Sequence, residues 1–144
     1  MAARLRALNE EPEPPLPWPD VTMLRFRAAR GLDDDPRFLA TGGNSGYLAN
    51  NLAVHLAGMV DHGGRIVLLG FDMQLGPAGE RHFHGDHSPG LRNPDAQDLA
   101  RWADCFGSLQ DALLARGIVA VNCSRVSALT CFPRVRIEDE VASW

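Results

Sequence analysis

The chain has 144 residues, a formal net charge of −4 and a hydrophobic fraction of 45%, which are values typical of one globular domain. All 14 basic residues are arginines scattered along the chain, so no basic stretch predicts a nucleic-acid or anionic membrane surface. No apolar run approaches the ~20 residues of a membrane span, and the start of the chain lacks the apolar core of a signal peptide. We therefore expect a cytoplasmic protein with no nucleic-acid and no membrane partner.

The first part of the chain predicts an extended lead-in followed by a strand and a helix. Residues 1–20 are rich in proline, residues 21–26 have the composition of a short strand, and residues 29–43 are rich in turn formers. A helix is expected from Asn44, with Asn44 or Ser45 as its N-cap. Its predicted buried face, from the helical spacing, consists of Leu48, Leu52, His55, Leu56 and Met59.

The second part predicts a strand, a long polar loop, a helix and another strand. The apolar run 65–71 is typical of a strand covered on both faces, and residues 72–92 form the loop. Asn93 and Pro94 predict the start of a helix that continues to about Arg116. Its expected buried stripe is Leu99, Trp102, Phe106, Leu109 and Leu113. A third strand is expected at 118–124, and the last eight residues predict a short helix or tail.

This alternation of strands and helices indicates an α/β fold with a parallel sheet. Three strands make a thin sheet for a three-layer Rossmann-like fold, which normally has more of them. We therefore expect residues 21–144 to form a partial Rossmann-like domain that either completes itself as a homo-oligomer or is a shortened descendant of the full fold. The three cysteines, Cys105, Cys123 and Cys131, lack C-x-x-C spacing and predict reduced thiols.

Two segments predict a ligand pocket at one end of the sheet. The sequence TGGNSG (41–46) brings glycines and small polar residues to a helix start, where backbone amides and the helix dipole favour an anion. A tight loop with a helix cap explains the same residues. Asp72 follows a strand at its carboxyl end, where open α/β sheets bind ligands, although a strand-ending turn is the alternative. The loops after residues 43, 71 and 122 are expected to converge.

The loop RHFHGDHS (81–88) is the segment richest in titratable side chains. His82, His84, Asp86 and His87 match the H-x-H-x-D-H zinc signature of metallo-β-lactamase-like hydrolases. That class needs a later histidine, and no histidine follows His87 in this chain. The alternatives are a metal site of another kind, a histidine that acts as a general base, and a polar surface loop. We expect no metal in this loop. A metal site formed by His82, His84, Asp86 and His87 is the weaker alternative.

The segment VNCSRVSALTCFP (121–133) follows the third predicted strand. Asn122, Ser124 and Ser127 are candidates to hydrogen-bond a ligand at the sheet edge, and serine-rich turns explain them equally well. The sequence of this segment indicates no Ser-His-Asp or Cys-His arrangement.

Four motifs in this order, TGGNSG, LLGFDM, HFHGDHS and VNCSRVSAL, resemble the phage and prophage branch of a Rossmann-like superfamily. It contains the 6-hydroxymethylpterin diphosphokinase-like proteins and, more distantly, the sialyltransferases of glycosyltransferase family 42. The resemblance covers about residues 38–135 and implies that Asn44, Ser45 and Gly46 contact a nucleotide-sugar donor. It implies that Asp72 lies in the active cleft and that His87 is the general base, with His84 as its rival.

The resemblance also implies that Ser127 lies near the nucleotide. The family pattern begins with a strand and a GNGPS-type donor loop, and this chain enters the pattern after them. We therefore expect a nucleotide- or nucleotide-sugar-dependent group transferase with a small-molecule nucleotide ligand, and no other cofactor. The alternative is a non-catalytic phage or prophage binding or assembly module, and the second alternative is a zinc hydrolase.

Overall fold

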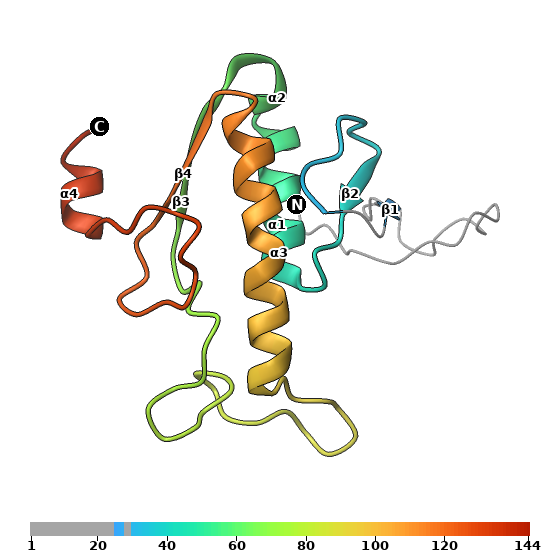
Figure 1. Ribbon diagram of the computed structural model, residues 1–144, viewed down its shortest axis with the longest axis vertical. Helices are drawn as coiled ribbons and strands as arrows, with labels where there is room; N and C mark the ends of the chain where they lie inside the picture. The colour runs from blue at the N-terminus through green and yellow to red at the C-terminus, as the bar shows by residue number, and fades with distance from the viewer. Residues whose placement is uncertain (1–24, 28–29) are drawn as a thin grey trace, which may run out of the picture.

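The structure, a computed structural model, describes residues 25–27 and 30–144. The predicted lead-in 1–20 and the first four residues of the predicted strand 21–26 lie outside this part. The described elements, in chain order, are β1 (Arg25–Arg27), β2 (Phe38–Ala40), α1 (Ser45–Leu56), α2 (Met59–His62), β3 (Gly64–Leu68), α3 (Ala96–Leu114), β4 (Ile118–Asn122) and α4 (Ile137–Val141) (Figure 1).

The fold is mixed α/β, and its parallel strands form two small sheets. β3 pairs with β4 in parallel, with α3 as the connection, as the predicted βαβ order requires. β1 pairs in parallel with β2, a strand that lies within the segment predicted as turns. The single three-stranded sheet is therefore not formed by the described residues, because the two sheets lie on opposite sides of the long helices (Figure 1).

The helix α1 begins where the sequence predicts, but it buries another face. Asn44 is the N-cap, and its side chain accepts a hydrogen bond from the backbone N–H of Tyr47. The buried residues are Tyr47, Asn50, Asn51 and Val54, whereas Leu56 of the predicted face is 79% exposed. Asn51 explains the difference: its Oδ1 accepts from the backbone N–H of Ala40, which couples α1 to β2.

The helix α3 begins two residues later than predicted. Asp95 is its N-cap and forms a capping box with Asp98, in which each side chain accepts from the other residue's backbone N–H. Asn93, the predicted cap, uses its Oδ1 to accept the backbone N–H of His87 instead. The predicted stripe is buried at Leu99, Phe106, Leu109 and Leu113, and Trp102 is half-buried.

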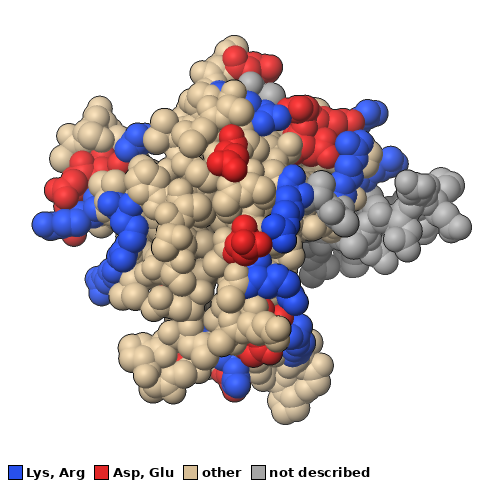
Figure 2. Space-filling view, in the orientation of Figure 1, with Lys and Arg blue, Asp and Glu red and all other residues tan. Residues whose placement is uncertain are grey.

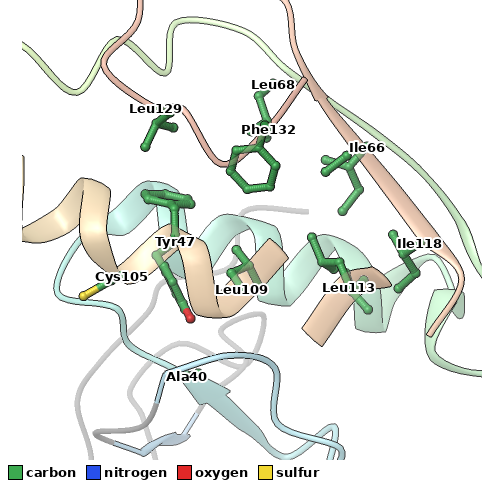
Figure 3. Packing of buried hydrophobic residues seen from close by; sticks show 13 residues of the cluster. Ala40, Tyr47, Ile66, Leu68, Cys105, Leu109, Leu113, Ile118, Leu129 and Phe132 are labelled. Carbon is green, nitrogen blue, oxygen red and sulfur yellow. The ribbon is translucent and has the colours of Figure 1, made fainter. Parts of the chain in front are cut away.

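The core lies between α1, α3 and one face of the β3–β4 sheet (Figure 3). Phe106 is at its centre, with ring centroids 5.2 Å from Tyr47, 5.9 Å from Phe71 and 6.0 Å from Phe132. The other face of the sheet is only partly covered, since Val67 of β3 is half-buried and Val119 of β4 is 42% exposed. The expectation of a strand buried on both faces therefore holds for one face only.

The surface carries its charges in mixed groups. Arginines and carboxylates lie side by side over the face seen in Figure 2, and much of that face is uncharged. Among the described helices, none has the length and apolar character needed to cross a membrane.

A buried carboxylate attaches the C-terminal helix to the sheet. Glu140 of α4 is 2% exposed, and Arg65 of β3 donates to both of its oxygens, with Nη2 2.6 Å from Oε2. This interaction holds the pKa of the Glu140 carboxyl below its usual value of 4.5. Folded Glu140 therefore binds a proton less readily than unfolded Glu140, so its contribution to stability is present above pH 4.5 and is lost as the pH falls through the folded pKa.

We predict that Glu140→Gln lowers the melting temperature by several degrees at neutral pH and has a much smaller effect below the folded pKa, where Glu140 of the wild type is protonated. The measurement is thermal unfolding followed by circular dichroism across this pH range. Asp61→Asn, at an exposed residue of α2, is the control and should parallel the wild type. A Glu140→Gln deficit that is the same at every pH would contradict the predicted linkage.

Candidate functional site

A pocket of about 610 Å³ lies where the start of α1, the segment after β3 and the loop before α3 meet. An adjoining hollow shares Asn44, Ser45, His82, Pro94 and Trp102 with it. Segments far apart in the sequence therefore contribute to one continuous concave surface, and two of the three predicted loops, those after residues 43 and 71, converge there.

The start of α1 presents backbone amides to this pocket. Gly42 and Gly43 have φ angles of 50° and 82°, which turn the chain sharply into Asn44. Asn44 caps the amide of Tyr47, and the amides of Ser45 and Gly46 have no acceptor among the described residues. Gly46 is also a close-approach position, because an added Cβ would lie 2.9 Å from the ring of Phe71. The TGGNSG segment is thus a capped tight turn that also leaves donors open to a ligand.

Asp72 is exposed and lines the pocket together with the start of α1. Its position is set by the backbone on either side. The N–H of Phe71 donates to Ser124 Oγ at 2.8 Å, and the carbonyl of Asp72 accepts from the N–H of Ala128 at 2.7 Å. Met73, which follows, has φ 48°, a conformation that non-glycine residues rarely adopt. The loop after β4 therefore holds the Asp72 turn in place.

Asn122 and Ser127 lie behind the pocket wall. The Asn122 side chain donates to Ser127 Oγ at 2.9 Å and accepts the N–H of Ser124, and Ser127 Oγ donates to the carbonyl of Phe71 at 2.6 Å. Asn122 is fully buried. Their hydrogen bonds thus stay within the protein, where they support the Asp72 turn, and neither residue lines the pocket that contains Asn44.

The loop 81–88, which contains three histidines, forms the outer wall of this concave surface. His82 and His87 line the hollow next to Asn44 and Ser45, whereas His84 is exposed and lies outside it. The Nδ1 atom of His87 lies 3.3 Å from the carbonyl oxygen of Arg92, and its backbone N–H donates to Asn93. Asp86 instead pairs with Arg81, with Nη1 2.9 Å from Oδ2.

Sequence reasoning missed the aromatic and cationic residues of the pocket. Trp102, predicted as core, is half-buried against Gly43, whose added Cβ would lie 3.1 Å from the indole. Phe83 is fully exposed on the rim, and Arg81 and Arg92 also contribute to the walls. Phe83 is an aromatic residue within a polar, histidine-rich loop, and this could have identified it as a candidate pocket residue. No local signal distinguished Trp102 from its core neighbours.

A buried acidic residue organises the cationic side of the site. Asp98 is 3% exposed in its side chain and accepts from Arg101 at 2.7 Å and from Arg92. The backbone N–H of Asp95, followed by Arg92, holds the pKa of the Asp98 carboxyl below its usual value. Asp98 therefore stays ionised and holds the Arg92 guanidinium beside the start of α1.

The cysteines show no sign of activation. Cys105 and Cys123 are buried, Cys131 is partly buried, and all three are free thiols. Burial raises the pKa of Cys123 and of Cys131, which keeps both thiols protonated and poorly nucleophilic.

Comparison with family models, with curated proteins and with solved structures finds no match for this chain.

Proposed function

We propose that this chain is a group transferase that binds a phosphate-bearing nucleotide, such as a nucleotide sugar, in the pocket at the start of α1. The observation that carries the proposal is that Asn44 and Ser45 of the amide-presenting turn line one hollow with His87, although they are far apart in the sequence, and that Gly46 lines the adjoining pocket. A donor site and a proton acceptor lie close together in this arrangement. A Rossmann-like relationship, which the sequence motifs suggest, is part of the same proposal.

The phosphate of the ligand binds at the N-terminus of α1. The amides of Ser45 and Gly46 are open donors, and the dipole of a 12-residue helix favours negative charge at that end. Arg92, held by Asp98, adds a cation to the same hollow. Together they supply hydrogen bonds and charge to a phosphate without any lysine.

The base of the nucleotide stacks on the aromatic residues of the pocket. Trp102 and Phe83 both line it, and aromatic rings bind the flat face of any base without selecting among them. Asp72, exposed in the wall, accepts hydrogen bonds from sugar hydroxyls.

In the transfer step, His87 takes the proton of the acceptor hydroxyl. If Nδ1 donates to the Arg92 carbonyl, Nε2 has a free lone pair and is the basic atom. The acceptor oxygen forms a bond to the anomeric carbon of the donor as the bond from that carbon to the phosphate oxygen breaks. The nucleotide leaves with the bonding electrons, and its phosphate charge is stabilised by the α1 amides.

Calorimetric titration with CMP, CDP, UDP and ATP, and with the corresponding nucleotide sugars, tests the binding site. The sharpest variant is Ser45→Pro, because proline is tolerated at the first helical position and removes the amide donor, and an alanine control accounts for the hydroxyl that is lost with it. Asn44 has extended angles, φ −149° and ψ 158°, which suit a residue before proline. We expect Ser45→Pro to weaken binding about tenfold, the effect of one charge-assisted hydrogen bond.

Ser45→Ala is the matched control, since it keeps the amide and should bind as the wild type does. If no nucleotide binds, or if the proline variant binds as tightly as the alanine variant, the proposed donor site is wrong. His87→Ala should abolish transfer without weakening nucleotide binding more than about twofold. Unchanged transfer by this variant would remove His87 as the base.

A further inference from the structure

The three histidines of the loop before α3 lie together as a group. The rings of His82 and His87 have centroids 4.2 Å apart, those of His82 and His84 are 5.0 Å apart, and those of His84 and His87 are 5.7 Å apart. One ring nitrogen from each residue lies within 4.8 Å of the others. The rings are stacked, and an imidazole binds a metal in its ring plane, so the side chains would rotate out of the stack to direct the three nitrogens at one ion.

One of these rings has an unsatisfied nitrogen. The Nε2 atom of His82 is buried and has no hydrogen-bond partner among the described residues. A buried polar atom without a partner is rare, and coordination of an ion is one of its standard explanations. His82 also lies in the middle of the group, stacked against both of its neighbours.

A second ring is oriented by its surroundings. The contact between His87 Nδ1 and the Arg92 carbonyl is the arrangement that commonly supports metal-bound histidines. If Nδ1 donates to this carbonyl, Nε2 is left as a ligand. Asp86 does not belong to the group, because its carboxylate pairs with Arg81. The ligand set is therefore three neutral imidazoles, which suit zinc and similar transition metals better than calcium or magnesium.

We propose that His82, His84 and His87 form a three-histidine site for a divalent transition metal of the zinc class. Two of the three ligands, His82 and His87, line the hollow that contains Ser45, so the ion would lie next to the pocket, and three protein ligands leave one coordination position for water or another ligand. This inference is independent of nucleotide binding. It does compete with the base role of His87, because a metal ion occupies the same Nε2 atom.

The test uses tag-free, chelator-treated full-length protein and zinc alone, measured by competition with a chromophoric chelator and by elemental analysis after gel filtration. We expect one equivalent of zinc. His84→Ala, at an exposed residue, should weaken binding at least tenfold, and the double variant His82→Ala/His87→Ala should abolish it. His62→Ala is the matched control, since His62 is an exposed histidine of α2 outside the group, and it should bind zinc as the wild type does.

Cobalt substitution tests the ligand type. We expect a visible spectrum of cobalt bound by nitrogen, without the thiolate charge-transfer band that the free cysteines would cause. Less than stoichiometric zinc, equal binding by His84→Ala and the wild type, or a thiolate band would overturn the proposal. Because no nucleotide is present, these outcomes leave the donor site untouched, and failure of nucleotide binding in turn leaves the metal result unaffected.

Discussion

Replacement of Gly42 by alanine is expected to destabilise the fold by about 2–5 kcal/mol. Gly42 has φ 50°, in the left-handed region, and an added Cβ would overlap the ring of Tyr47. Tyr47 is fully buried, and its hydroxyl is anchored by the backbone of Gly31, so the ring has no free space to move into. The backbone of the turn must shift instead, and that shift moves Asn44 away from its capping position. The measurement is chemical denaturation followed by circular dichroism.

The expected loss of stability in Gly42→Ala has two causes, which are the positive φ and the overlap of the added Cβ with Tyr47. Gly58→Ala separates them. Gly58 has φ 65°, but an added Cβ there would meet no atom within 4 Å. It should therefore cost only the backbone strain, about 1–2 kcal/mol. If Gly42→Ala lowers the free energy of unfolding no more than Gly58→Ala does, the turn accommodates the added Cβ without disturbing Tyr47. The calorimetric nucleotide titration described above, repeated on Gly42→Ala, should also show weaker binding, because the Asn44–Gly46 turn forms the proposed phosphate site.

Truncation of Phe106 is expected to have an effect of similar size. Phe106 is fully buried at the centre of the core and contacts three other aromatic rings. Phe106→Ala removes these contacts and leaves a cavity between α1, α3 and the sheet, at a cost of about 3–5 kcal/mol. This is a large part of the stability of an ordinary domain, so we expect a much lower denaturation midpoint or a failure to fold.

Leu114→Ala is the matched control on the same helix. Leu114 lies at the end of α3 and is 54% exposed, so its truncation should change the free energy of unfolding by no more than about 0.5 kcal/mol. Phe106→Leu should retain much of the stability, because it keeps most of the buried volume. Similar losses for Phe106→Ala and Leu114→Ala would contradict the position of the core.

Local sequence signals were sufficient for the long elements. The spacing from Leu99 to Leu113 predicts α3 and its buried stripe, and Asn44 predicts the start of α1. These signals depend on residues three to seven positions apart, whose relation is set by the helix itself. The apolar runs that became β3 and β4, and the parallel pairing implied by the helix between them, were predicted for the same reason.

Contacts between distant residues decided the rest. Strand β2 has three residues and forms by pairing with β1 and by bonding to Asn51, so no periodicity marks it. The hydrogen bond from Ala40 to Asn51 also explains why α1 buries the face that carries Asn50 and Asn51. Local hydropathy predicts that this face is exposed to solvent.

The candidate site shows the same division. The sequence by itself identified the candidate residues of the loop 81–88, but its zinc-like pattern contains four candidates and the structure groups only three. Asp86 is separated by its ion pair with Arg81, and Trp102 enters the pocket because Gly43 leaves room for the indole. Side-chain pairing and packing of this kind depend on where the folded chain places each partner, and local pattern carries no information about that.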